Sequence, residues 1–378
     1  MPRTSLNRSI EAADRPVLLE TAAQLLDAQH SWANSQLLGI DTEFVRERTY
    51  RAELGLVQVS DGDTAWLVDT VRLESLEPLR EMLEAPGVTK ILHSVSEDLE
   101  VLYHTLAAIP APLIDTQVAC AFLGQPLQMG YHATVKWLFD IEVDKEQTRS
   151  NWCRRPLTER QLHYAAMDAV LLPEIATTLL ARLKENGRVA WMQEEVERAR
   201  KKAAGVTRPM DAWKRIRGSL RLDDRALRAL RQLAAWREER ASSRNLARGF
   251  VAPDAGLLNL ARARPTTKQG ILAIEGIHAK VLERHADELL DALRRADEDH
   301  SPLDRPAPLD GPARRLLDAL RDRVQKRAAE LEIEPALLAS RKDLERLLRA
   351  EWRGEAPPDR FTGWRQTVIT DDLLSIIR

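Results

Sequence analysis

The chain has 378 residues, a length typical of two or three domains, and its 44% hydrophobic content allows sizeable cores. Its N-terminus has no apolar stretch of the signal-peptide type and no run of 18 apolar residues occurs, so we expect a soluble, cytoplasmic protein that does not enter membranes. The net charge of −2 hides an asymmetry, because residues 201–285 hold 19 Lys and Arg against 8 Asp and Glu. Such a basic block favours a module that binds polyanions, although charge alone also fits simply solvated helix faces.

The first half of the chain mixes strand and helix patterns. We expect strands at residues 37–44 and 89–94, and a hairpin of residues 54–60 and 64–70 around the turn DGD. Helical periodicity follows at 96–107, 115–124 and 134–139. A longer helix should begin after the cap Thr158 and end at Gly187. This order predicts an α/β or α+β domain that ends near residue 195.

From about residue 206 the strand patterns almost vanish. Residues 206–218 have the look of a linker, and apolar residues then recur at helical spacing. A proline-rich spacer at 301–312 separates this helical module from a third segment, which is also helical. At an offset of 87 residues the two helical segments share apolar positions, which predicts a duplicated bundle: Leu230 with Leu317, Leu233 with Leu320, Val251 with Leu338, Leu257 with Leu344, and Leu260 with Leu347.

Three acidic signals mark the first half. Asp41 and Glu43 lie two residues apart in an apolar strand, so both side chains point to the same face, about 6.6 Å apart along the chain. Asp98 follows the strand at 89–94 at the start of a helix, and Asp168 lies in a mostly apolar helix one turn after Tyr164. Each has an ordinary alternative when taken singly, such as a first-turn carboxylate favoured by the helix dipole for Asp98. An unpartnered carboxylate among the apolar neighbours of Asp168 would be costly.

A joint explanation is a metal site. Four converging carboxylates would raise one another's pKa values and destabilise the fold unless cations neutralised them. The two cysteines lie in no metal-ligand pattern and no His ligand is near in sequence, so an oxygen-liganded Mg²⁺ or Mn²⁺ fits best. Two such ions about 3.5–4 Å apart are the apparatus for in-line displacement at a phosphodiester. Tyr164, on the same helix face as Asp168, could orient the attacking water.

The ordered motifs IDTEF, HSVSEDLEVL and LTERQLHYAAMDAVLL resemble those of the ribonuclease D family of DEDD exonucleases, in the subtype with a Tyr-x-x-x-Asp third motif. PMDAWKRIRG resembles the opening of the HRDC module that follows the nuclease domain in that family, and FTGWRQTVI resembles the end of a second HRDC-like bundle. The resemblance implies a ribonuclease H-like α/β exonuclease domain at 1–205, with a mixed sheet flanked by helices. It further implies an HRDC helical domain at 206–298 and a second HRDC-like helical domain at 299–378.

The resemblance also implies the role of each site residue. Asp41 would bridge two divalent ions, Mg²⁺ or Mn²⁺, and Glu43 and Asp168 would complete the site of the attacking water. Asp98 would reach the second ion mostly through water, and Tyr164 would hydrogen-bond the nucleophilic water. The expected activity is a metal-dependent 3′–5′ exoribonuclease that releases nucleoside 5′-monophosphates from tRNA precursors and other small structured RNAs with single-stranded 3′ ends. A monomer is expected.

Two alternatives stay open. The nearest is a 3′–5′ DNA exonuclease of the Werner or proofreading kind, because motifs do not show a contact to the 2′-hydroxyl. The other is a non-catalytic RNA-binding scaffold, against which the intact carboxylate set argues.

The basic block supplies candidate contacts to RNA. Basic residues interleaved with aromatics suit single-stranded nucleic acid, and HRDC modules of the family are auxiliary nucleic-acid-binding domains. The candidate residues are Lys214, Arg217, Arg221, Arg244 and Arg248. The third segment is less basic and is therefore a weaker candidate.

Overall fold

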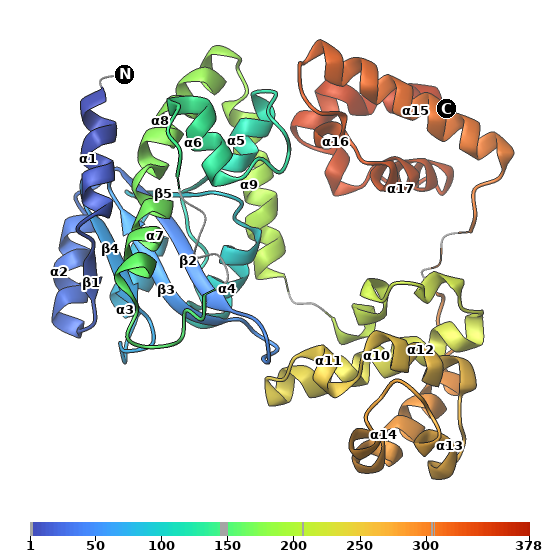
Figure 1. Ribbon diagram of the computed structural model, residues 1–378. Coiled ribbons are helices and arrows are strands. Elements are labelled where there is room, and N and C mark those ends of the chain that lie inside the picture. The colour runs from blue at the N-terminus through green and yellow to red at the C-terminus, as the bar shows by residue number, and fades with distance from the viewer. Residues whose placement is uncertain (1–2, 144–149, 206–207, 304, 306) are drawn as a thin grey trace. The chain divides into compact units, whose positions relative to one another are not determined.

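The computed structural model describes all residues except 1–2, 144–149, 206–207, 304 and 306 (Figure 1). The chain forms two compact units, of which the first comprises Met1–Val45, Leu54–Ala204 and Leu309–Arg378, and the second Arg46–Glu53 and Gly205–Pro308. This grouping differs from three consecutive domains. The C-terminal bundle belongs to the same unit as the first domain, and a short segment directly after the first long strand belongs to the second unit.

The first unit contains a six-stranded mixed sheet in the order β1-β4-β3-β2-β5-β6. Its strands are β1 Val17–Leu19, β2 Leu37–Val45, β3 Glu53–Ser60, β4 Ala65–Asp69, β5 Thr89–Leu92 and β6 Leu113–Asp115. The pairs β1–β4, β2–β5 and β5–β6 are parallel, whereas β3 and β4 form the predicted antiparallel hairpin. The mixed sheet confirms the predicted α/β class. The short outer strands β1 and β6 were not predicted, because three residues are too few to show an alternating pattern.

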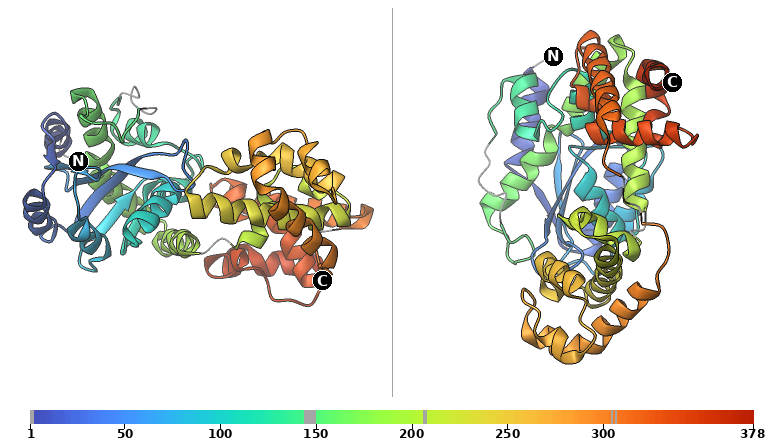
Figure 2. Two further views of the ribbon diagram at one scale, coloured as in Figure 1. Left: turned by 90° about the horizontal axis from the view of Figure 1, so that it is seen from below. Right: turned by 90° about the vertical axis from the view of Figure 1, so that its right-hand side faces the viewer.

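Helices cover both faces of this sheet (Figure 2). They are α1 Arg3–Ala13, α2 Ala22–Trp32, α3 Glu77–Glu84, α4 Ser96–Leu106, α5 Thr116–Phe122, α6 Tyr131–Phe139, α7 Glu159–Val170, α8 Leu172–Glu185 and α9 Val189–Ala204. The helix predicted at 158–187 begins as expected, since Thr158 and Gln161 form a capping box. It is divided into α7 and α8 at Leu171, two residues before Pro173, whose ring leaves no N–H for the helical ladder.

The stretch Glu159–Glu185, which spans α7 and α8, is long and apolar enough to cross a membrane by length and composition. However, 67% of its most apolar window is buried inside the protein. The core helix of a soluble domain passes the same test, so this stretch is weak evidence for a membrane span.

The second unit is a helical bundle. It contains the short 3₁₀ helices η1 Pro209–Arg215 and η2 Ser219–Arg221, followed by α10 Asp224–Arg244, α11 Arg248–Val251, α12 Asp254–Ala263, α13 Lys268–Leu272 and α14 Ala279–Glu298. The prediction of a linker at 206–218 is wrong for residues 209–216. Trp213 and Ile216 are 3% and 2% exposed and belong to the core of the bundle, so this stretch is part of the folded module.

The C-terminal bundle repeats the start of the second unit. Its elements are α15 Gly311–Glu330, α16 Pro335–Leu338, α17 Arg341–Trp352, η3 Asp359–Phe361, a π-helical turn η4 Gln366–Thr370 and α18 Asp371–Ile377. The helices α15, α16 and α17 begin 87 residues after α10, α11 and α12, the offset predicted from the leucine pattern. The apolar residues used for that prediction are buried in both bundles, so the two segments share their core positions.

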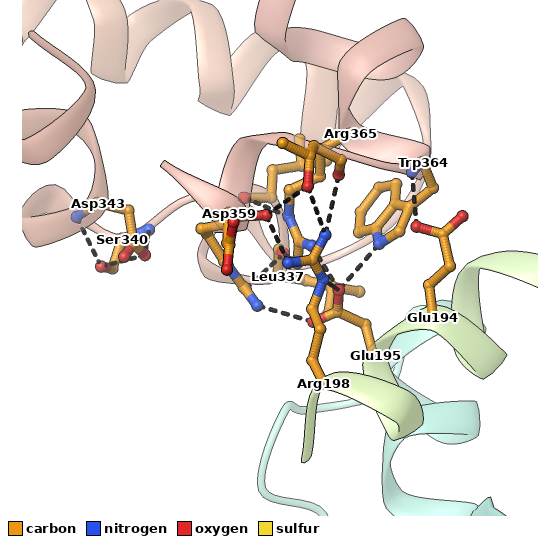
Figure 3. Close-up of polar contacts among 12 residues, drawn as sticks. Glu194, Glu195, Arg198, Leu337, Ser340, Asp343, Asp359, Trp364 and Arg365 are labelled. Atoms are coloured by element: carbon orange, nitrogen blue, oxygen red, sulfur yellow. Dashed lines mark hydrogen bonds and ion pairs between the residues drawn. The ribbon is translucent and has the colours of Figure 1, made fainter. Parts of the chain in front are cut away.

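The C-terminal bundle docks on α9 of the α/β domain through a buried charged network (Figure 3). Glu195 of α9 pairs with Arg365, which is fully buried, and with Arg360 at 2.7 Å. The indole Nε1 of Trp364 also donates to Glu195, at 3.0 Å. Trp364 stacks on Trp191 with their ring centroids 4.9 Å apart, so an apolar contact covers the ion pairs. This interface explains why the bundle belongs to the first unit.

We expect Glu195→Ala to lower the free energy of unfolding by about 3–5 kcal/mol, because it leaves Arg365 buried without its carboxylate. Urea unfolding followed by tryptophan fluorescence should detect the loss, since Trp364 and Trp191 lie at the interface. Glu355→Ala in the same bundle is the matched control. It breaks an exposed pair with Arg353, and we expect little or no loss because solvent screens such a pair. Equal losses of stability in the two variants would contradict the stabilising role of the buried Glu195–Arg365 pair.

Candidate active site

Strand β2 places two of the predicted carboxylates beside α7. Gly39, Asp41 and Glu43 alternate along β2 and therefore share one face of the sheet. A Cβ atom at Gly39 would lie 2.5 Å from the carbonyl oxygen of Ala169, so only glycine allows α7 to approach this closely. Because Ala169 follows Asp168 directly, this close approach brings the third carboxylate over the first two.

The structure brings Asp41, Glu43 and Asp168 together. Each offers a carboxylate oxygen, and these oxygens all lie within 4.8 Å of one another. Tyr164 lies one turn before Asp168 on α7, and its hydroxyl is close enough to lower the pKa of the Asp168 carboxyl. The four side chains therefore form the cluster that the motif order predicts.

Asp98 lies beside this cluster rather than within it. It sits in the first turn of α4 and is 8% exposed. The hydroxyl of Thr42, the residue between the two β2 carboxylates, donates a hydrogen bond to Asp98 Oδ1. The charge of Asp98 is close enough to raise the pKa of Asp41. The role of Thr42 was not predicted, because a threonine in a strand is ordinary in sequence.

The carboxylates disturb one another's protonation. Burial, followed by the charges of neighbouring carboxylates, raises the pKa of Asp41 well above its usual range and that of Glu43 to about 9. Burial also raises the pKa of Asp168 to about 7 and that of Asp98 to about 6. Burial and the nearby Asp168 raise the pKa of Tyr164, so its hydroxyl keeps its proton at neutral pH. A divalent cation would offset this concentration of negative charge, and an all-carboxylate donor set fits hard ions such as Mg²⁺ and Mn²⁺.

These shifts predict how pH changes the stability of the metal-free protein. The folded pKa values of about 6, 7 and 9 for Asp98, Asp168 and Glu43 exceed the ordinary 3.8, 3.8 and 4.5. Between these limits the folded state binds more protons than the unfolded state, so stability falls as pH rises from about 4.5 to 9. In EDTA, we expect the Tm to drop by roughly 5 °C between pH 6 and pH 9.

Added Mn²⁺ should stabilise the protein more at pH 9 than at pH 6, because the ion takes the place of the protons. Asp98→Asn serves as the control, since it removes one of the charges and should reduce the pH dependence in EDTA. Thermal scans that show the same Mn²⁺ stabilisation at both pH values would contradict the coupling.

Two polar residues near the site have structural partners. The ring of His93 is held by Thr116 Oγ1 at Nδ1 and by the Met129 carbonyl oxygen at Nε2, both at 2.8 Å. Asp115 caps α5, since its carboxylate accepts a hydrogen bond from the backbone N–H of Gln117 at 2.9 Å. By contrast, His132 places Nε2 3.8 Å from Asp168 Oδ1, at the margin of the cluster.

The basic residues predicted to bind RNA differ in their surroundings. Arg217, Arg221 and Arg244 are exposed, and Lys214 is exposed beside Asp211, 2.9 Å away. Arg248 is only partly exposed, since its guanidinium donates to the carboxylate of Glu238 at 2.6 and 2.7 Å. Contact with RNA stays a prediction for all five.

Comparisons with known proteins find matches for the α/β domain and for both helical bundles. Residues 16–184 match the family model "3'-5' exonuclease", residues 226–293 match "HRDC domain", and residues 313–373 match "Ribonuclease D, C-terminal HRDC domain". Ribonuclease D of Pseudomonas paraeruginosa is 37% identical over 361 residues, covering 94% of this chain and 96% of that protein. Ribonuclease D of Escherichia coli is 33% identical over 348 residues, covering 90% and 92%.

Among solved structures, RNase D of Escherichia coli, described as an exoribonuclease involved in structured RNA processing, has a TM-score of 0.86. Its sequence is 31% identical, and the similarity covers 96% of this chain and 98% of that one. The resemblance therefore extends over the exonuclease domain and both helical bundles.

Proposed function

The chain belongs to the ribonuclease D family and is a 3′–5′ exoribonuclease, and we propose on that premise that it trims the 3′ ends of tRNA precursors and other small structured RNAs. Nucleotides leave one at a time as nucleoside 5′-monophosphates. The observation that carries the proposal is the cluster of Asp41, Glu43 and Asp168, with Asp98 and Tyr164 beside it, in the order of the family's motifs.

Divalent ions, which we propose to be two Mg²⁺ or Mn²⁺, would activate the attacking water and stabilise the leaving 3′-oxygen when bound. Asp41, Glu43 and Asp168, whose oxygens converge, would hold one ion, and Asp98, whose charge acts on Asp41, would help to hold the other. Thr42 orients Asp98 through its hydroxyl.

Tyr164 acts as a hydrogen-bond donor in this proposal. Its raised pKa keeps the phenolic proton in place at neutral pH, and the hydroxyl lies near enough to Asp168 to affect the pKa of that carboxyl. It can therefore donate to the attacking water and hold one lone pair toward the phosphorus. Tyr164→Phe removes only this hydroxyl, and we expect it to slow hydrolysis about 10²-fold or more.

We further propose that the protein works in the cytoplasm as a monomer, away from membranes. Its most apolar stretch is largely buried in the exonuclease domain, which supports a place away from membranes. Light scattering of the purified chain would test the monomer.

The function is tested by a gel time course with a 5′-labelled RNA hairpin that carries a single-stranded 3′ tail. In Mg²⁺ or Mn²⁺ we expect a ladder that shortens from the 3′ end, and in EDTA we expect no shortening. A DNA tail of the same sequence should be degraded more slowly. Faster loss of the DNA tail would favour a DNA exonuclease, and binding without shortening in either metal would favour a non-catalytic scaffold.

A further inference from the structure

The segment Arg46–Glu53 leaves the strand of the catalytic carboxylates yet folds into the second unit. Its anchor is Tyr50, whose hydroxyl donates to Glu238 Oε1 at 2.6 Å. Arg248 closes the contact, because its guanidinium lies 4.4 Å from the Tyr50 ring centroid and also pairs with Glu238. Glu238 is 3% exposed, so the triad of Tyr50, Glu238 and Arg248 is partly buried in the bundle and is not a chance contact on its surface.

Two further hydrogen bonds join the segment to the turn between α10 and α11. The backbone N–H of Ala247 donates to the Arg48 carbonyl oxygen at 2.8 Å, and the Arg51 N–H donates to Asn245 Oδ1 at 3.1 Å. Arg48 and Arg51 are therefore held beside the residues that precede α11, and both are exposed.

This turn presents apolar side chains to solvent. Phe250 is 59% exposed and Leu246 is 44% exposed, although Val251 beside them is buried in the core. Burying an aromatic ring is favourable, and the bundle core forms without Phe250. Arg244 is exposed at the end of α10 on the same turn, so the apolar pair is flanked by basic residues.

We propose that Phe250 and Leu246, together with Arg48, Arg51 and Arg244, bind unpaired nucleotides of the RNA substrate, with the Phe250 ring stacking on a base. An exposed ring beside free guanidinium groups suits single-stranded nucleic acid, since bases stack on the ring while the cations follow the phosphates. In the part of the chain that the structure describes, the side chains of Arg48, Arg51 and Arg244 make no ion pair or hydrogen bond. The balance of 19 basic to 8 acidic residues over 201–285 favours RNA over a protein partner.

This inference rests on the proposed function, because it assigns a surface to the same RNA substrate. The inference also assigns a role to the segment Arg46–Glu53, which begins three residues after Glu43 in the sequence. The segment contributes Arg48 and Arg51 to the proposed RNA-binding surface. Tyr50 and Arg248 hold this surface in shape, and Arg248 is thereby a positioning residue.

The test measures binding of the full chain in EDTA, by fluorescence anisotropy, to an RNA hairpin with a single-stranded 3′ tail and to the same hairpin without a tail. Phe250→Ala should raise the Kd for the tailed RNA at least about fivefold, the size of a lost stacking contact, and leave the blunt hairpin nearly unchanged. Phe250→Trp keeps a ring and should bind like the wild type. Leu272→Ala, which shortens a 48% exposed leucine in the same bundle, is the matched control and should have no effect.

A second readout separates this inference from the proposed function. Hydrolysis of the p-nitrophenyl ester of uridine 5′-monophosphate needs the carboxylates but no RNA strand, so Phe250→Ala should hydrolyse it at the wild-type rate. If the wild type itself fails to hydrolyse any phosphodiester, the proposed function fails while the binding comparison still stands. A wild-type Kd for Phe250→Ala, or an equal loss in Phe250→Trp, would overturn the inference.

Discussion

Replacing Asp41 by asparagine should reduce kcat on a tailed RNA at least about 10³-fold, equivalent to about 4 kcal/mol of transition-state stabilisation. The reason is its central place, since the charges of Glu43, Asp98 and Asp168 all act on it. Asparagine keeps the size of the side chain but loses the charge that holds a cation. Single-turnover hydrolysis in saturating Mn²⁺ would measure the loss.

Two accompanying measurements separate lost chemistry from lost folding. In EDTA the Asp41→Asn variant should melt at or above the wild-type Tm, because one of the repelling charges has gone. Its Kd for RNA should stay within about twofold of the wild type, as expected for a change confined to the carboxylate cluster. Glu97→Gln, which alters an exposed carboxylate next to Asp98, should retain full activity. An Asp41→Asn enzyme that keeps a tenth of the activity would remove Asp41 from the site.

The carboxylates could be predicted from sequence because each is costly in its setting. Two carboxylates on one face of a strand and one carboxylate in an apolar helix each require a partner. The order of the motifs predicted that these carboxylates converge around shared cations. The repeat was predictable for a similar reason, because Leu230 and Leu317 mark helix faces that must be buried.

Other features could not be predicted, because they depend on contacts between residues far apart in the sequence. A local sequence pattern does not show such contacts. Residues 209–216 have the composition of a linker, but Trp213 finds a place in the bundle core. Glu195 and Arg365 are separated by 170 residues, and nothing near either one marks their ion pair. The anchoring of Tyr50 to Glu238, 188 residues apart, is equally invisible in sequence.

Thr42 and Gly39 show, within the carboxylate cluster, that the importance of a residue can depend on distant parts of the chain. Both lie in the motif strand, but their importance comes from α4 and α7, which pack on it. Thr42 joins β2 to α4 through one hydrogen bond, and Gly39 sets how closely α7 approaches. The geometry of the cluster therefore depends on residues that carry no charge.

Gly39→Ala should accordingly lower kcat about 10²-fold without changing any charged or polar group. The added methyl would lie 2.5 Å from the Ala169 carbonyl oxygen and 2.8 Å from Leu172 Cβ, so the end of α7 must move away from β2. A displacement of about 1 Å in Asp168 relative to Asp41 is enough to cost about 10²-fold in rate. Overpacking should also lower the free energy of unfolding by about 1–3 kcal/mol.

Gly87→Ala is the control, because a Cβ at Gly87 meets nothing within 4 Å. Kinetics should be measured well below the Tm of Gly39→Ala, so that the lost activity reports displaced carboxylates rather than unfolded protein. Weaker Mn²⁺ affinity in calorimetric titration should accompany the slower rate, since Asp168 would no longer converge with Asp41 and Glu43. If the variant melts earlier but binds Mn²⁺ and cleaves RNA like the wild type, the helix relaxes without moving Asp168, and the close approach at Gly39 serves packing alone.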